Sequence, residues 1–310
     1  KNMKNFYKFF KKLILISVLF GFLGVISILY FLWKYSPELP SYSELKNYNP
    51  SLASRVFTSD GLLLDKYFIQ ERIFVPIDRI PQNLINAFIS SEDKNFFEHS
   101  GIDFIAIIRA IITNIYNKLN NKRMIGASTI TQQVVKNLLL SNELSLERKF
   151  KEMILAIRIE NVLEKKKILE LYLNDIYLGY GSYGVASASL NYFNKSLDEL
   201  SIEENAFLAA LPKAPNNYNP VKNYISALDR RNWVLKRMYQ NGYIEKKDLA
   251  LSSNPIIVQE RYEDIFEDSN YFKQEVRKQL YDLLGKQALY EQGLIIKTSI
   301  DTTLQKKLNE

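Results

Sequence analysis

Two acidic residues, Glu92 and Asp93, stand side by side where an apolar run of the sequence ends. The run before them has the spacing of a buried helix, and Gly101 breaks the pattern shortly afterwards. A carboxylate at such a helix end is partly removed from water, which raises its pKa and suits it to proton transfer. The only histidine of the chain, His99, lies close by. An ordinary pair of solvated acids at a surface helix end is the alternative interpretation.

A second group of polar side chains follows a glycine, over residues 126–137. Thr129 followed three residues later by Gln132 fits a capping box, so we expect a helix to begin here. The amino end of a helix can bind an anion, because its backbone N–H groups are free and its dipole end is positive. Gln133 and Lys136 share one face of this helix, since they lie three residues apart. A plain capped helix without a ligand is the alternative.

A third group combines both signs of charge on one predicted helix. Arg148 and Lys149 precede Glu152 by four and three residues, so the three side chains can project together. The apolar stripe of the same helix consists of Phe150, Met153, Ile154 and Ile157. Taken alone, this pattern is also typical of a solvated ladder of ion pairs.

The elements that must position these groups are mostly helical, from Pro81 to about residue 250. Before them, residues 55–64 predict a hairpin that turns at Asp60–Gly61, and residues 73–76 are expected to extend it. Glycines at 179, 181 and 184 indicate close backbone packing beside a cleft. A phosphate-binding loop is disfavoured there because no predicted strand precedes them.

An uncharged stretch near the start of the chain predicts a membrane anchor. Residues 1–12 carry five lysines and no acid, and residues 13–33 then carry no charge. A helix of this length spans roughly 31 Å, the thickness of a bilayer core. The lysines place the amino end in the cytoplasm and the rest of the chain outside it. A cleavable signal peptide is the alternative, but no small-x-small cleavage site follows Trp33.

Composition excludes several classes of function. The net charge is +7, and the five lysines at the amino end account for most of it, leaving +2 elsewhere. This is too little for a nucleic-acid-binding surface. The absence of cysteine excludes disulfides and thiolate chemistry, and a single histidine argues against a zinc site.

Residues 104–119 form a predicted helix whose apolar side chains cover more than one face. Either the helix is buried in the core, or it lies partly in the membrane surface with the basic loop 117–123 after it. Its length of about 16 residues is too short to span a bilayer comfortably.

Taken in order, these groups resemble the motifs of the peptidoglycan glycosyltransferases, glycosyltransferase family 51, and in particular the amino-terminal half of class A penicillin-binding proteins. The matching blocks are Glu92–Asp93 with Phe96, His99 and Gly101; Gly126 to Gln133; Arg148–Lys149 with Glu152; and Tyr172 through Asn174 to Gly184. The resemblance covers residues 1–301. Residues 293–301 resemble the strand that leads into the family's transpeptidase half, which the sequence printed here does not include.

The resemblance implies a mainly α fold: a lysozyme-like helical glycosyltransferase domain with a membrane anchor helix and a small β-rich linker region. The expected division is a basic cytoplasmic tail (1–12), an anchor (13–33), the glycosyltransferase domain (34–250) and a linker (251–310). The implied location is the cytoplasmic (inner) membrane, crossed once, with the catalytic domain on the outer, periplasmic side.

The implied reaction transfers a growing glycan from polyprenyl pyrophosphate to the 4-hydroxyl of lipid II, with inversion. Glu92 matches the general base, and Glu152 matches the second carboxylate, which assists the leaving group. The expected substrate-binding residues are Asp93, Ser128, Thr129, Gln133, Lys136, Asn137, Arg148, Lys149 and Lys213. The residues expected to hold the site in shape are Phe96, His99, Gly101 and Asn174.

The resemblance implies no required cofactor and no resident metal, although a divalent cation could accompany the substrate pyrophosphate. The expected partners are lipid II, the nascent glycan strand, the bilayer and cell-wall synthesis proteins, and not nucleic acid. Two alternatives remain: a lysozyme-like glycan hydrolase, which needs no cluster of phosphate-binding cations, and a non-catalytic cell-wall scaffold, which needs no catalytic carboxylates.

Overall fold

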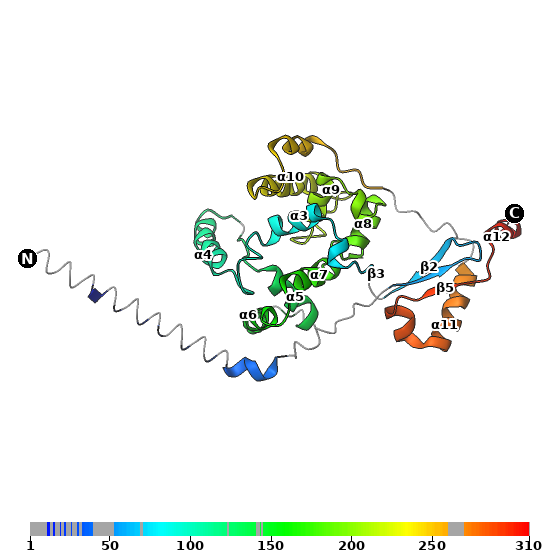
Figure 1. Cartoon of the computed structure of the whole chain (residues 1–310), viewed down its shortest axis with the longest axis horizontal. Helices are drawn as coiled ribbons and strands as arrows, with labels where there is room; N and C mark the ends of the chain where they lie inside the picture. The colour runs from blue at the N-terminus through cyan, green and yellow to red at the C-terminus, as the bar shows by residue number, and fades with distance from the viewer. Residues whose placement is uncertain are drawn as a thin grey trace, which may run out of the picture.

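The computed structural model of the chain is shown in Figure 1. The residues it describes are 11, 12, 15, 19, 22, 26, 30, 33–39, 53–68, 71–122, 124–140, 143, 145–259 and 270–309. The predicted cytoplasmic tail and membrane anchor, residues 1–33, lie mostly outside these. Within the described part of the chain, no helix is both long enough and apolar enough to cross a membrane.

A body of packed helices makes up most of the described structure, as the periodicity predicted. Its α-helices are α3 (Gln82–Glu92), α4 (Phe104–Leu119), α5 (Ile130–Leu139), α6 (Leu146–Glu160), α7 (Lys165–Asp175), α8 (Val185–Phe193), α9 (Ile202–Leu208) and α10 (Tyr224–Gln240). Short 3-10 helices occur as η1 (Ser36–Glu38), η2 (Ile77–Arg79), η3 (Leu197–Glu199) and η4 (Lys246–Ser253). The fold is therefore mainly helical.

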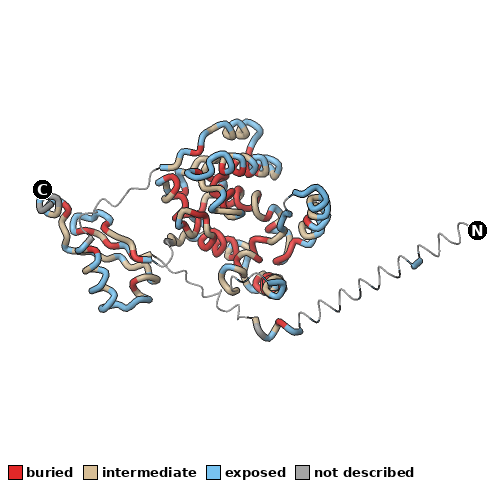
Figure 2. Tube along the Cα trace, turned by 180° about the vertical axis from the view of Figure 1, so that it is seen from behind, coloured by how far each residue is buried: buried red, intermediate tan, exposed pale blue. Residues whose placement is uncertain are grey.

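The helix α7 lies in the middle of this body, and every residue from Ile168 to Asp175 is buried. Helix α5 packs against α6 and α7, and α10 packs against α3 and α9. Figure 2 shows the buried segments gathered in the interior of the body. The three charged groups of the sequence lie on α3, α5 and α6, so this packing brings them toward one another.

Local sequence signals set the starts of these helices. The predicted capping box of α5 is confirmed, because the Thr129 hydroxyl accepts from the Gln132 N–H and the Gln132 side chain accepts from the Thr129 N–H. Ser145 caps α6 in a similar way, by accepting from the Arg148 N–H at 3.0 Å. Each cap fixes the start of a helix that carries a predicted site residue, Lys136 on α5 and Glu152 on α6.

The predicted hairpin is also confirmed, as strands β1 (Ser54–Phe57) and β2 (Leu63–Tyr67). β5 (Ile295–Lys297), inside the segment expected to form a strand, pairs in parallel with β1. The strands pack against α11 (Asn270–Glu291), and α12 (Thr302–Asn309) follows. This sheet has its own small hydrophobic core of Val56, Leu64, Tyr67 and Leu289, distinct from that of the helical body.

The expected extension of the hairpin through residues 73–76 is wrong. The next strand is β3 (Glu71–Arg72), and it pairs in parallel with β4 (Ser182–Tyr183). Residues after it are held by side chains of α7: Asn174 accepts from the Val75 N–H at 2.8 Å, and Glu170 accepts from the Ile77 N–H at 2.9 Å. Because these side chains satisfy the backbone groups, the segment needs no strand partner.

Helix α4 has the predicted bounds, but the buried-core interpretation of it is wrong. Ala110 is its only buried residue. The large hydrophobic side chains that are more than half exposed are Phe104, Ile105, Ile108, Ile111, Ile112, Ile115, Tyr116 and Leu119. Figure 1 shows α4 at the edge of the helical body, and Figure 2 colours most of this helix as exposed. These apolar side chains therefore do not pack in the hydrophobic core of the helical body.

Candidate active site

Glu92 is the last residue of α3 and is partly buried. The Gln133 amide of α5 donates a hydrogen bond to its carboxylate at 2.9 Å. Burial raises the pKa of Glu92, while Gln133 and the positive charges of Arg230 and Lys213 act in the opposite direction. The raised pKa predicted from its place at a helix end is confirmed. Such a carboxylate can accept a proton from a bound hydroxyl group.

The neighbouring carboxylate of Asp93 turns into the protein instead. It accepts from the backbone N–H of Ile130 at 3.0 Å, at the start of α5. Nε2 of His99 lies 3.0 Å from the same carboxylate. Asp93 therefore ties the end of α3 to the start of α5, and a direct contact between Asp93 and substrate stays a prediction.

The loop after Asp93 is packed tightly against α5 and α6. Phe96 is fully buried, and its ring meets that of His99 edge-on, with 6.3 Å between the ring centroids. The backbone carbonyl of Gly101 accepts from the Thr129 hydroxyl at 2.7 Å. Gly101 has a φ of +90°, and a Cβ there would lie 2.6 Å from the carbonyl oxygen of Ala156 in α6. The glycine is required for this approach.

The second carboxylate, Glu152, projects from α6 and is almost fully buried. It forms an ion pair with Lys149 on the same helix, and the Lys149 ammonium also donates to the Ser128 hydroxyl at 2.8 Å. The loop before α5 is thereby joined to α6 through this lysine. Only the Glu152 end of this ion pair is buried, so removal of Lys149 would leave the carboxylate of Glu152 without that compensating charge.

Lys136 on α5 lies within the electrostatic reach of both carboxylates. Burial lowers the pKa of its ammonium group, and the positive charges of Arg148 and Lys149 lower it further, whereas Glu152 and Glu92 raise it. The structure thus groups the two predicted catalytic acids around one half-buried lysine, with further cations beside it. A site of this composition can hold a doubly charged phosphate group next to a base.

Two other predicted residues take part in contacts between elements. Asn137 hydrogen-bonds to Asp175, the last residue of α7, and Arg72 of β3 forms an ion pair with that aspartate at 2.7 Å. Asn174 holds Val75, as described above, and also donates to the Glu170 carbonyl at 2.8 Å. Lys213 is exposed on the loop after α9 and acts on Glu92 through its charge. Binding of substrate by Asn137 and Lys213 stays a prediction.

The predicted close packing of the glycine-rich run is confirmed at two of its three positions. A Cβ at Gly184 would lie 2.6 Å from the carbonyl oxygen of Asn174, and one at Gly179 would lie 2.9 Å from the Tyr192 hydroxyl. Gly181 has open space instead. The run therefore packs its backbone against the end of α7 and against α8.

Sequence reasoning missed Arg230 on α10, which acts on Glu92 from a distant part of the chain. The signal was present: Arg230 and Arg231 interrupt a helix whose other buried residues are Ala227, Val234, Leu235 and Met238. Two arginines among buried positions call for compensating contacts, because charged groups are seldom fully buried without them.

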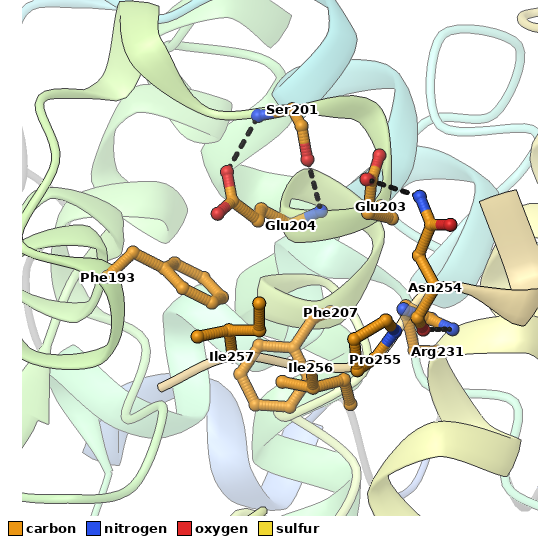
Figure 3. A pocket seen from close by; sticks show the side chains of 10 residues that line it. All are labelled: Phe193, Ser201, Glu203, Glu204, Phe207, Arg231, Asn254, Pro255, Ile256 and Ile257. Carbon is orange, nitrogen blue, oxygen red and sulfur yellow. Dashed lines mark hydrogen bonds between the residues drawn. The ribbon is translucent and has the colours of Figure 1, made fainter. Parts of the chain in front are cut away.

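A separate cavity of about 230 Å³ lies away from the two carboxylates. Its lining is Phe193, Ser201, Glu203, Glu204, Phe207, Arg231, Asn254, Pro255, Ile256 and Ile257. Figure 3 shows the Asn254 amide donating to Glu203, a bond of 3.1 Å, beside Arg231. None of the residues predicted to bind substrate lines this cavity. The described residues also contain no group of three or more acidic or histidine side chains arranged to hold a metal ion.

Known proteins are similar to this chain in sequence. Residues 60–239 match the sequence family described as Transglycosylase. The chain is 47% identical to penicillin-binding protein 1A of Rickettsia typhi (strain ATCC VR-144 / Wilmington), over 96% of this chain and 38% of that protein. It is 40% identical to penicillin-binding protein 1A of Escherichia coli (strain K12), over 96% of this chain and 35% of that protein.

A crystal structure of penicillin-binding protein 1A from Haemophilus influenzae is 28% identical, with a TM-score of 0.49 over 83% of this chain and 28% of that one. The chain thus spans well under half the length of the curated relatives it matches. The matched family segment contains Glu92, Lys136 and Glu152. The chain belongs to the transglycosylase family.

Proposed function

We propose that the protein is a peptidoglycan glycosyltransferase that polymerises lipid II into glycan strands for cell-wall synthesis. The observation that carries the proposal is the grouping of Glu92 and Glu152 around the half-buried Lys136, with Arg148 and Lys149 beside them. Two carboxylates alone would also suit a glycan hydrolase. The cluster of cations favours a substrate that carries a pyrophosphate.

In this reaction Glu92 removes the proton from the 4-hydroxyl of the acceptor sugar. The hydroxyl oxygen then attacks the anomeric carbon of the growing glycan, and the bond from that carbon to the pyrophosphate oxygen breaks with its electron pair. A single displacement inverts the anomeric carbon. The hydrogen bond from Gln133 supports the role of Glu92, because it fixes the carboxylate at the end of α3.

The leaving pyrophosphate gains negative charge as the bond breaks, and cations placed in advance stabilise that charge. Lys136, Arg148 and Lys149 supply it, and arginine can hold two phosphate oxygens at once. Glu152 acts by holding Lys149 in place through their ion pair. Ser128, Thr129 and Asn137 complete the proposed contacts with the sugars and phosphates.

The substrate carries a lipid, so the site must lie close to a bilayer. The exposed apolar face of α4 supports contact with the membrane surface, because contiguous exposed apolar side chains mark interaction sites. The segment after the predicted anchor also contacts the catalytic body: Tyr35 is buried, and the Lys151 ammonium of α6 lies 5.3 Å from its ring centroid. We place the catalytic body on the outer side of the cytoplasmic membrane, behind a single anchor.

A gel assay of lipid II polymerisation tests this function, with Glu92→Gln as the main variant. Loss of the general base should reduce turnover by about 100-fold to 10,000-fold. Glu98→Gln is the matched control, because Glu98 lies in the neighbouring loop but is exposed, and it should retain activity. Full activity of Glu92→Gln would refute the assignment of the base. Cleavage of polymeric glycan without polymerisation of lipid II would show a hydrolase instead.

A further inference from the structure

Helix α10 presents a tryptophan between two arginines on one of its faces. Arg230, Trp233 and Arg237 follow one another at spacings of three and four residues, so their side chains lie on the same face of the helix. The guanidinium carbon of Arg230 lies 3.8 Å from the ring centroid of Trp233, and that of Arg237 lies 5.7 Å from the same centroid. The aromatic ring therefore holds a cation on each side along the helix.

Neither arginine forms an ion pair with a carboxylate in the part of the chain that the structure describes. Arg230 is 9% exposed, and its Nε has no hydrogen-bond partner among the described residues. The Nε of Arg237 is buried without a partner in the same way, although its Nη1 donates to the Gln240 side chain at 3.3 Å. Buried guanidinium groups are costly when acceptors are missing. A ligand with negatively charged oxygens would supply the acceptors that this face lacks.

The same face is open to such a ligand. Trp233 is 40% exposed, so one part of its ring meets solvent. The terminal nitrogens of Arg230 form no hydrogen bond with a described residue, yet they are not closed off from solvent as its Nε is. A ligand can therefore reach the ends of the guanidinium groups while it rests against the indole ring.

The end of α10 that carries Arg237 is fixed beside the end of α3. The side-chain amide of Asn241, one turn after Arg237, donates to the Ser90 hydroxyl at 3.2 Å, and Ser90 lies two residues before Glu92. Figure 1 shows α10 on one side of α3, and α5 and α6, which carry the proposed pyrophosphate-binding cations, on the other. Burial raises the pKa of Glu92 and the charge of Arg230 opposes this effect, which agrees with a face close to the base.

We propose that Arg230, Trp233 and Arg237 form a binding site for the carboxylates of an acidic peptide, namely the peptide stem of the lipid II unit that accepts the glycan. This inference rests on the proposed function and names the part of the substrate that α10 contacts. Arginine holds a carboxylate through two parallel N–H···O hydrogen bonds. The indole ring offers an apolar surface to the rest of the peptide.

A phosphate group is the other anion that two arginines could bind. The proposed site already provides Lys136, Arg148 and Lys149 for the pyrophosphate, and these residues lie on α5 and α6 rather than on α10. A ligand with hydroxyl groups alone would not require two cations. Charge complementarity therefore favours a carboxylate on α10, and inorganic pyrophosphate serves as the competing probe in the test.

Trp233 can report directly on a ligand at this face. The chain contains two tryptophans, Trp33 and Trp233, so Trp33→Phe leaves Trp233 as the only source of tryptophan emission in the full chain. The probe is N-acetyl-L-alanyl-D-glutamic acid, a soluble stem fragment whose carboxylates are free, and its diamide is the uncharged control. Saturable changes in the emission of Trp233 are expected with the acid and not with the diamide.

Arg237→Gln, made in the Trp33→Phe protein, should weaken binding of the acid about 10-fold. Arg237→Met keeps an apolar stem beside the ring and covers the case in which Arg237→Gln does not fold, and thermal unfolding identifies the folded variants. Lys236→Gln is the matched control, because Lys236 is an exposed cation on the neighbouring position of α10, and it should bind the acid normally.

Lipid II polymerisation provides the second measurement. Arg237→Gln should raise KM for lipid II about 10-fold with little change in kcat, because the contacts with the stem are equal in the ground state and the transition state. Lipid II whose stem carboxylates are amidated should give the unaltered protein and Arg237→Gln the same KM.

Equal emission changes with the acid and the diamide, or no saturable change with either, would overturn the inference. A stronger response to inorganic pyrophosphate than to the acid would also overturn it, as would a fall in kcat without a rise in KM, which is the effect of a disturbed helix. Failure of the unaltered protein to polymerise lipid II would refute the proposed function, while the emission titration would still decide whether α10 binds the acidic peptide.

Discussion

A methyl group added at Gly101 would test how closely the loop after Glu92 is held to α6. The φ of Gly101 is +90°, which side chains rarely adopt. A Cβ there would lie 2.6 Å from the carbonyl oxygen of Ala156 and 2.9 Å from the backbone nitrogen of Ile157. Both atoms belong to the backbone of α6, about one turn after Glu152, so they cannot rotate away. Gly101→Ala must therefore move the loop.

Two contributions determine how much stability Gly101→Ala should lose. The left-handed backbone costs a residue with a side chain roughly 1–2 kcal/mol, and overpacking against a fixed neighbour adds roughly 1–3 kcal/mol. Gly101→Ala should therefore lower the free energy of unfolding by about 2–5 kcal/mol. In a domain of this size each kcal/mol lowers Tm by about 2–4 °C, so a fall of roughly 4–20 °C is expected.

Gly181→Ala is the matched control for backbone strain. Gly181 also has a positive φ, of +73°, but a Cβ there would meet no atom within 4 Å. It should lose only the strain contribution, about 1–2 kcal/mol. Thermal unfolding followed by circular dichroism measures both variants, and the polymerisation assay should show a larger loss for Gly101→Ala. Equal losses of stability in the two variants would refute the close contact between the loop and α6.

Three further predictions concern the base, the cations and the membrane face. Because burial raises the pKa of Glu92, polymerisation should be lost, as the pH falls, at a pH above the pKa of a solvated glutamate, which is about 4.3. Loss of activity only at or below that pH would contradict the assignment of Glu92 as the base. Lys136→Ala should weaken both turnover and the binding of a pyrophosphate-bearing inhibitor, reducing kcat/KM by roughly 100-fold, whereas Glu92→Gln should bind that inhibitor almost normally. In the protein shortened to begin after residue 33, Ile112→Asp on α4 should reduce liposome binding about 10-fold. Ile225→Asp is the control, because Ile225 is exposed on α10, and it should not reduce binding. Unchanged binding by a folded Ile112→Asp variant would exclude the membrane contact.

The sequence alone was sufficient to predict those parts of the structure that depend on contacts between residues close together in the chain. The capping box of Thr129 and Gln132 places the start of α5, because both of its hydrogen bonds join residues three apart. The turn at Asp60–Gly61 places the hairpin for a similar reason. The order and spacing of the charged groups also indicated the family, and with it the chemistry, before any fold was known.

Only the tertiary structure decided which side chains meet and which face solvent. Periodicity made residues 104–119 a helix, but an apolar helix has the same pattern whether protein or lipid covers it, and the packing leaves this one exposed. The segment 73–76 resembles a strand, yet Asn174 and Glu170 of a distant helix satisfy the backbone at Val75 and Ile77.

The surroundings of Glu92, the proposed base, also depend partly on the local sequence and partly on the tertiary structure. The sequence placed Glu92 at a helix end, and that position is enough to predict a raised pKa. It did not indicate that the charge of Arg230, which comes far later in the chain, acts on Glu92, because α10 must first pack against α3. The type of each proposed catalytic group is thus encoded locally, whereas its electrostatic environment is produced by long-range packing.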